Sequence, residues 1–179
     1  MFSEFPAFAD RRAAGRTLAA ALAPLVLDPC VVVALTRNAV PVAFEIARAL
    51  EASLALFKRE DALPAPELVD RTIGRIVVLV DDGAADASEL RSALTARRRG
   101  RTSLVYATPV ASKETLGIAA AYADQTVCLL EPDPFYGVGA HFGEFHRVSG
   151  AEVARFLHEA RDPHASPAPP LAPPVIDAI

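Results

Sequence analysis

The sequence predicts an α/β fold in which a mostly parallel, twisted sheet is flanked by helices. Two observations predict it. Short runs of β-branched and other apolar residues alternate along the chain with segments of helical pattern. The central run, 76–80 (IVVLV), contains no polar residue, which is typical of a strand covered on both faces inside a parallel sheet. Strands that alternate with helices in this way are joined by right-handed crossovers.

Capping and turn residues place the elements along the chain. Asp10 can cap a first helix that ends near Ala23, and Pro41 favours the first turn of a second. Ser149 and Glu152 have the spacing of a capping box at the start of a last helix. Between these we expect strand 30–35, helix 40–50, strand 53–57, a central strand from Ile73 or Ile76 to Val80, helix 86–99, strand 103–107 closed by Pro109, helix 113–123 and strand 126–130.

We expect a single domain over residues 1–161, followed by a tail. A chain of 179 residues of which 52% are apolar can bury a sizeable core. Residues 133–148 are rich in glycine and aromatic residues and predict an irregular hood on this domain. Residues 162–179 are crowded with prolines that cannot form a helix, so we expect an extended, polyproline-like or disordered tail. The alanine-rich first helix, the aromatic arm (Phe2, Phe5, Phe8) and the hood favour a homodimer.

The composition argues against nucleic-acid and membrane partners. The net charge is −4, and the one basic cluster, Arg97 to Arg99 with Arg101, is better explained as a solvated helix end. No stretch is long and apolar enough to cross a bilayer, and the N-terminus lacks the features of a signal peptide. Cys30 and Cys128 lie in or beside apolar runs without a Cys-x-x-Cys spacing. We therefore expect free thiols and a cytoplasmic protein.

Asp81, Asp82 and Gly83 directly follow the central strand. Open α/β sheets bind their ligands at the carboxyl ends of the strands, and the free N–H groups of a following helix would face the same place. The two carboxylates could bind a ribose diol, or a magnesium ion through water. They could instead cap the strand end by accepting hydrogen bonds from the following amides. The residues themselves leave both interpretations open.

Several segments, in chain order, resemble the type I phosphoribosyltransferases. The strand–Asp–Asp–Gly–loop–helix unit at 76–90 resembles their ribose-phosphate loop, and 8–15 (FADRRAAG) resembles their opening helix, Phe-x-Asp-Arg-x-x-Ala-Gly. Residues 34–43 (ALTRNAVPVA) resemble their pyrophosphate loop, usually Arg-Gly-Gly-Val-Pro-Val. Residues 108–111 and 134–139 match in the same order. The resemblance implies a phosphoribosyltransferase-like, Rossmann-like fold with a small hood.

The resemblance also implies a substrate, a metal and residue roles. An active member would join a nitrogenous base to phosphoribosyl pyrophosphate with magnesium, so a nucleotide or sugar-phosphate ligand is expected. Asp81 and Asp82 would contact the ribose and magnesium, and Arg37 would assist the pyrophosphate. Phe135 and Tyr136 could stack on the base, or their rings could instead pack in the core or at an interface. The remaining implied binding positions are Asn38 and Ala39 at the pyrophosphate and Gly83, Ala84, Ala85, Asp86, Ala87 and Ser88 at the 5′-phosphate.

The ribose-phosphate loop departs from the family pattern. Asp86 and Glu89 stand where the family has threonines, and Ala87 stands where it has glycine. A carboxylate ~4 Å from a phosphate charge costs about 4 kcal/mol at an effective dielectric near 20. Millimolar binding is worth roughly 4 kcal/mol in total, so the family substrate should bind poorly. The alternative to a ligand-binding role for Asp86 is that it caps its own helix, with Glu89 completing a capping box.

Two further departures point the same way. Asn38–Ala39 replaces the glycine pair of the pyrophosphate loop, and 58–75 is shorter than the mobile segment that closes over the substrate in relatives. We therefore expect weak or no phosphoribosyl pyrophosphate-dependent transfer. The alternative is an active magnesium-dependent phosphoribosyltransferase. A receiver-type signalling domain is excluded. In a receiver the acidic pair follows the first strand, whereas in this chain at least two predicted strands precede Asp81 and Asp82. A metal site could be suspected at His141, Glu144 and His146. No further potential metal ligand stands at helical or hairpin spacing from them, so we expect solvated side chains instead.

Overall fold

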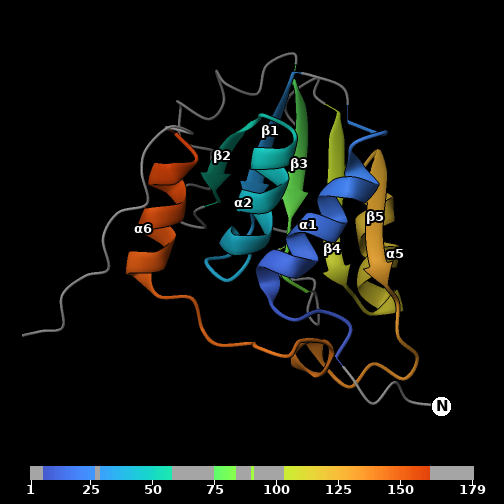
Figure 1. Cartoon of the computed structure of the whole chain (residues 1–179). Helices are drawn as coiled ribbons and strands as arrows, with labels where there is room; N and C mark the ends of the chain where they lie inside the picture. The colour runs from blue at the N-terminus through green and yellow to red at the C-terminus, as the bar shows by residue number, and fades with distance from the viewer. Residues whose placement is uncertain (1–5, 27–28, 58–74, 84–89, 91–102, 162–179) are drawn as a thin grey trace, which may run out of the picture.

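The computed structural model describes residues 6–26, 29–57, 75–83, 90 and 103–161. Within these ranges the fold is α/β, as predicted, with five strands in one all-parallel sheet of order β2-β1-β3-β4-β5 (Figure 1). The strands are β1 (Cys30–Ala34), β2 (Ser53–Leu56), β3 (Ile76–Val80), β4 (Leu104–Val110) and β5 (Gln125–Leu130). The described helices are α1 (Arg11–Leu22), α2 (Val40–Ala49), α5 (Lys113–Tyr122) and α6 (Gly150–Glu159), with a 3-10 turn, η1 (Val138–His141).

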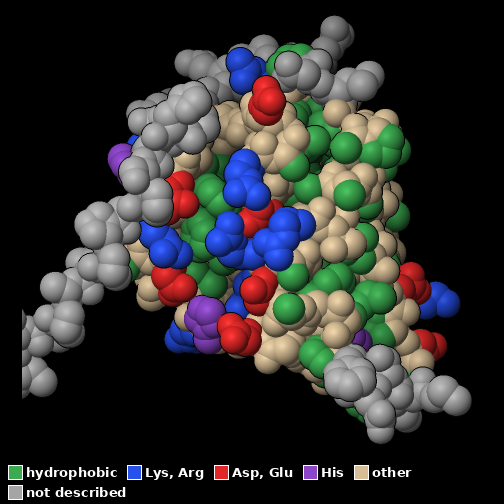
Figure 2. Space-filling view, viewed as in Figure 1, with side chains coloured by type: hydrophobic (Ala, Val, Ile, Leu, Met, Phe, Trp, Pro, Cys, Tyr) green, Lys and Arg blue, Asp and Glu red, His purple; other side chains and the backbone are tan. Residues whose placement is uncertain are grey.

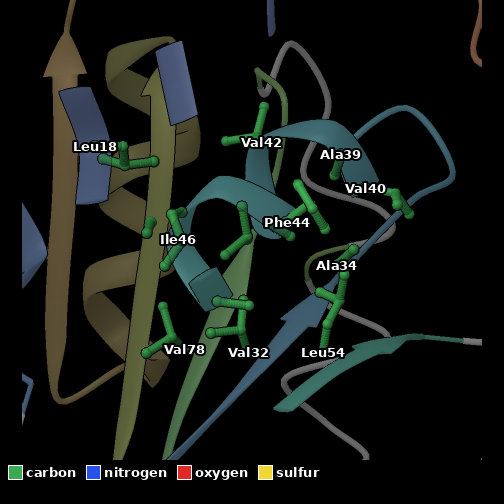
Figure 3. Packing of buried hydrophobic residues seen from close by; sticks show 14 of the residues in the cluster. Leu18, Val32, Ala34, Ala39, Val40, Val42, Phe44, Ile46, Leu54 and Val78 are labelled. Carbon is green, nitrogen blue, oxygen red and sulfur yellow. The ribbon is translucent and has the colours of Figure 1, made fainter. Parts of the chain in front are cut away.

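Helices cover both faces of the sheet, which explains why its strands are apolar on both sides. In Figure 1, α1, α2 and α6 lie over one face and α5 lies behind the other. The first face contributes Val32 and Val78 to a core with Leu18 of α1 and Ile46 of α2 (Figure 3). The alternate residues of the same strands face the other way, into a core made of Val31, Val33, Val77, Leu79, Leu90, Leu104, Tyr106 and Ala119.

The predicted helix caps are present. The Asp10 carboxylate accepts a hydrogen bond from the Ala13 amide at 2.7 Å and begins α1. Ser112 caps α5, and Ser149 with Glu152 forms the complete capping box of α6. Gly15 permits a close approach of α1 to α2, because a Cβ there would lie 2.7 Å from the Val42 carbonyl oxygen. Local sequence signals therefore place these helices correctly.

The prediction that Pro109 closes its strand was wrong, because β4 continues through it to Val110. β3 pairs with β4 only as far as Val80 and Ala107, so the proline lies beyond the end of β3. The amide that Pro109 lacks is therefore not needed to pair with that strand. On its other side β4 remains paired with β5 through Thr108 and Val110.

Several predicted segments lie outside the described residues: most of helix 86–99, segment 58–74, the tail 162–179, and Phe2 and Phe5 of the aromatic arm. Phe8 of that arm is buried and its ring lies 5.4 Å from the ring of Phe142 in the hood. Neither Cys30 nor Cys128 is part of a disulfide bond in the structure. Among the helices that the structure describes, none has the length and apolar character needed to cross a membrane.

Candidate functional site

The loops after β1 and β3 meet at the carboxyl edge of the sheet. The two strands are neighbours, and the Leu35 amide at the end of β1 donates to the Val80 carbonyl at the end of β3 at 2.8 Å. Asp81 and Asp82 follow β3 and are both buried, with 7% and 6% exposure. The parallel sheet therefore brings the predicted acidic pair beside the loop that carries Arg37, Asn38 and Ala39.

Asp82 forms a buried ion pair with Arg11, the first residue of α1. Arg11 Nε lies 2.9 Å from Asp82 Oδ2, and the arginine is only 5% exposed. A second nitrogen of the guanidinium donates to the His146 carbonyl at 2.6 Å, and its carbon lies 3.9 Å from the centre of the Phe145 ring. Sequence reasoning did not assign Arg11 to the site, although its place in the Phe-x-Asp-Arg segment was an available signal.

Asp81 is held by backbone contacts at the end of β3. Its amide donates to the Ala107 carbonyl at 3.0 Å, and its Oδ1 accepts a hydrogen bond from the Asp82 amide at 2.9 Å. Asp81 thus caps the end of the strand, one of the two arrangements that the sequence allows. Burial raises the pKa of the nearby Tyr106 hydroxyl well above its ordinary value, and the negative charge of Asp81 raises it further. Because Asp81, Asp82 and Tyr106 are all buried, the acidic pair lies in a water-poor environment.

The hood packs directly on the Asp81-Asp82-Gly83 turn. Gly83 has φ +144°, and a Cβ at this position would overlap Cγ1 of Val138 in η1. A side chain is therefore excluded both by the backbone conformation and by the hood. Val110, Val138, Phe8 and Phe142 form the small apolar cluster that holds this contact together.

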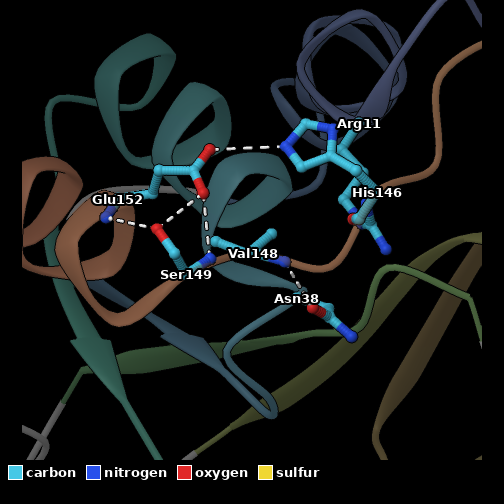
Figure 4. Close-up of polar contacts among 6 residues, drawn as sticks. All are labelled: Arg11, Asn38, His146, Val148, Ser149 and Glu152. Carbon is cyan, nitrogen blue, oxygen red and sulfur yellow. Dashed lines mark hydrogen bonds and ion pairs between the residues drawn. The ribbon is translucent and has the colours of Figure 1, made fainter. Parts of the chain in front are cut away.

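The loop after β1 is held by hydrogen bonds within the chain. The Ala39 amide donates to the Thr36 carbonyl at 3.2 Å and to its hydroxyl at 3.1 Å, and Ala39 is fully buried. Asn38 Oδ1 accepts a hydrogen bond from the Val148 amide at 3.0 Å (Figure 4). The two residues that replace the family's glycine pair are thus engaged with their own chain.

Residues 143–148, the last part of the hood and here called the strap, lead to α6 and are hydrogen-bonded to residues 8–11. The Gly143 and Glu144 amides donate to the Phe8 and Ala9 carbonyls, both at 2.8 Å. Farther along the strap, Arg11 holds the His146 carbonyl, and Asn38 holds Val148. The strap therefore contacts the loop after β1 directly, through Asn38 (Figure 4), and is connected to the acidic turn through the Arg11–Asp82 pair.

The strap ends in the capping box of α6. The Ser149 amide and hydroxyl both donate to Glu152 Oε2, at 2.9 and 2.8 Å. These hydrogen bonds lower the pKa of Glu152, and the His146 ring, 3.3 Å from Oε1, contributes to the effect. The contacts favour the ionised carboxylate, because each donor stabilises its negative charge.

The other predicted site residues are placed as follows. Arg37 is exposed and makes no ion pair with any described residue. Phe135 is half-buried and stacked on His141, with 6.5 Å between ring centres, whereas Tyr136 is 71% exposed. The phosphate-loop positions Ala84, Ala85, Asp86, Ala87 and Ser88, and also Glu89, lie outside the described residues.

The acidic pair does not fit a magnesium ion in this arrangement. Magnesium requires oxygen ligands with little competing positive charge, whereas Asp82 Oδ2 already faces the Arg11 guanidinium at 2.9 Å. Among the described residues there is also no group of three or more histidine, cysteine or acidic side chains that could hold a metal, and this includes His141, Glu144 and His146.

Comparisons with known proteins agree with this architecture. No protein-family model matches the chain. Two Mycobacterium tuberculosis proteins, from strains CDC 1551 and H37Rv, are each 32% identical over 207 residues, and each is named "Putative phosphoribosyl transferase" (MT0597 and Rv0571c). The alignments cover 86% of this chain and 47% of theirs, so the chain spans about half the length of these curated relatives.

A solved structure extends the comparison to three dimensions. The crystal structure of TT1426 from Thermus thermophilus superposes with a TM-score of 0.71 at 30% sequence identity. The match covers 85% of this chain and 98% of TT1426. The fold is therefore shared with that protein over nearly its whole length.

Proposed function

The chain belongs to the phosphoribosyltransferase family, and on that premise we propose that it is a member with weak or no phosphoribosyl pyrophosphate-dependent transfer. The observation that carries this proposal is the ion pair between Arg11 and Asp82. The carboxylate that the family resemblance assigns to the ribose is used by the protein itself.

The energy needed to open that ion pair is comparable to the free energy of substrate binding. Opening a buried pair leaves an uncompensated charge and costs about 3–5 kcal/mol. Substrate binding in the millimolar range is worth only about 4 kcal/mol. A ribose that had to displace Arg11 from Asp82 would therefore lose most of its binding free energy.

The loop after β1 supports the same conclusion. In the family, the glycine amides of this loop approach the diphosphate. In this chain the Ala39 amide donates to Thr36, and Asn38 is held by Val148. A diphosphate would have to replace these internal contacts before it could use the loop.

The ribose-phosphate loop adds an electrostatic argument from the sequence alone. Asp86 and Glu89 place two carboxylates in the segment that would surround the 5′-phosphate. Each would repel the phosphate instead of donating a hydrogen bond to it. We therefore propose a module that kept the sheet and lost the substrate loops. Its homodimeric state and cytoplasmic location remain predictions.

Thermal unfolding with magnesium and phosphoribosyl pyrophosphate tests this proposal. We expect a shift below about 1 °C at roughly millimolar ligand, because a ligand that binds only weakly adds little stability. The variant Asp86→Thr/Ala87→Gly/Glu89→Thr should show a larger shift than the wild type, because it restores donors and removes two negative charges. Ser88→Thr, in the same segment and with no change of charge, is the matched control. A shift of several degrees in the wild type would overturn the proposal.

An active magnesium-dependent transferase is the alternative, and specific observations favour it. The chain retains Asp81-Asp82-Gly83 beside the loop after β1, and Arg37 is exposed there. This alternative requires Arg11 to release Asp82 on binding, since the present geometry does not fit magnesium. Release of pyrophosphate from phosphoribosyl pyrophosphate, measured with a panel of purine and pyrimidine bases, distinguishes the two functions.

A further inference from the structure

Four arginines gather on the face formed by α1, α2 and α6, away from the acidic pair at the sheet edge. They are Arg12, Arg16, Arg48 and Arg155, here called the arginine cluster. Figure 2 shows the basic side chains lying together over α1 and α2, around an acidic group. Neither the proposed function nor the contacts around Asp82 uses this surface.

A single buried carboxylate lies at the centre of the cluster. The Glu45 side chain is 1% exposed, and Arg12 Nη2 lies 2.6 Å from its Oε1. Arg16 Nη1 lies 3.6 Å from the same oxygen, and Arg48 Nη2 lies 3.0 Å from Oε2. Three guanidinium groups thus share one negative charge, so their positive charge is only partly balanced.

The arginines keep donors available to solvent. The side chains of Arg12, Arg16 and Arg48 are 45%, 55% and 62% exposed. A guanidinium has five N–H donors, and contact with one carboxylate oxygen uses only part of this set. The unused donors are those that can form paired hydrogen bonds to further carboxylates.

Aromatic rings restrict the movement of two members of the cluster. The guanidinium of Arg155 lies 5.1 Å from the ring centre of the buried Phe156, and that of Arg12 lies 5.8 Å from Phe44 and 5.9 Å from Phe156. Arginines held against rings lose less conformational entropy when they bind a partner. The surface is therefore partly organised before any partner arrives.

The charge of the cluster is opposite to that of the chain. Its four guanidinium groups face the carboxylates of Glu45 and Glu159, which leaves two positive charges. The whole chain has a net charge of −4. The cluster is therefore a local positive surface that favours an anionic partner.

We propose that the arginine cluster binds a carboxylate-rich segment of another protein. Carboxylates can pair with the outer edges of the guanidinium groups, around the buried Glu45. A second copy of this chain placed cluster against cluster would bring like charges together. Nucleic acid requires neutralisation of many phosphates along a basic footprint, which four arginines with a central carboxylate on an acidic chain do not supply. An acidic protein segment therefore fits best.

Fluorescence anisotropy with a short labelled polyglutamate peptide tests the proposal on the full chain. We compare the wild type with Arg16→Gln/Arg48→Gln/Arg155→Gln, which keeps the close Arg12–Glu45 pair and hence the support of the buried carboxylate. The control removes three exposed arginines outside the cluster, Arg75→Gln/Arg147→Gln/Arg161→Gln, and so changes the net charge equally. Circular dichroism and melting curves verify that each variant is folded.

We expect the cluster variant to bind the peptide about tenfold more weakly and the control less than about twofold more weakly, with affinity falling as salt screens the charges. A polyglutamine peptide should not bind. Equal weakening in both variants, or no peptide binding by the wild type, would overturn the proposal. Tighter binding of a single-stranded oligonucleotide than of the peptide would also overturn it, in favour of a nucleic-acid surface.

Discussion

Arg11 and Asp82 are 71 positions apart in the sequence, yet their side chains form a buried ion pair of 2.9 Å. The pair joins the first residue of α1 to the end of the central strand, and the same guanidinium also holds the His146 carbonyl. One side chain thus connects the first helix, the acidic turn and the strap. The candidate site is organised by this contact.

Replacement of Arg11 should therefore destabilise the fold strongly. Arg11→Met leaves Asp82 buried without a partner, and we expect the free energy of unfolding in urea to fall by about 3–5 kcal/mol. Asp82→Asn in the same background should recover part of this loss, because it removes the unpaired charge. The exposed Arg75→Met is the control and should change stability by less than about 0.5 kcal/mol. A loss below about 1 kcal/mol for Arg11→Met would contradict the role assigned to the pair.

Gly83→Ala tests the contact between the hood and the acidic turn. The new Cβ would meet Val138 at a backbone with φ +144°, so we expect a loss of about 1–3 kcal/mol or more in urea unfolding. Val138→Ala should relieve the steric part of the loss but not the backbone part. Gly117→Ala, inside α5, places its Cβ in open space beside its own helix backbone and should instead raise stability by about 0.5–1 kcal/mol. Equal effects at the two glycines would show that the hood does not rest on Gly83.

Tyr106→Phe should cost little at neutral pH and should stabilise the protein at high pH. The buried hydroxyl makes no well-aligned hydrogen bond, although the Thr108 side chain is close enough to act on its pKa. Thr108 already donates its own hydroxyl proton to the Val110 carbonyl, so removal of the Tyr106 hydroxyl leaves no donor unpaired. Burial raises the pKa of Tyr106, so the folded state holds this proton more tightly than the unfolded state does. The wild type should therefore lose stability above about pH 10, the ordinary value for tyrosine, in a way that Tyr106→Phe does not. Parallel melting-temperature profiles for both proteins across that range would refute this prediction.

Glu152→Gln should lower stability at neutral pH but not at low pH, because it removes the negative charge of the α6 capping box. The folded-state pKa of Glu152 is lowered by hydrogen bonds from Ser149, so its ionised form adds stability above the unfolded value of about 4.3. That contribution is lost as the pH falls through the folded-state pKa. We expect the wild type to melt at a higher temperature than Glu152→Gln near pH 7, with the difference closing towards about pH 3. Glu159→Gln in the last turn of α6 is the control, and a constant difference for Glu152→Gln would contradict the assignment.

Much of the framework could be predicted from local patterns. The apolar runs placed the strands because a parallel sheet buries both of its faces, as Val77 and Val78 show by packing into opposite cores. Asp10 and Ser149 marked helix starts because a cap acts within one turn of its own helix. Pro109 misled the strand prediction, since whether its missing amide matters depends on how far the neighbouring β3 extends.

By itself the sequence determined the alternation of strands and helices, the capped helix starts and the position of Asp81 and Asp82 at the end of the central strand. Only the tertiary structure decided which groups the acidic pair meets: Arg11 at Asp82, and the hood through Val138 at Gly83. The physical reason is the range of the forces involved. Apolar periodicity and capping are written within a few residues, whereas an ion pair or a steric contact between distant segments exists only after helices and strands have packed together.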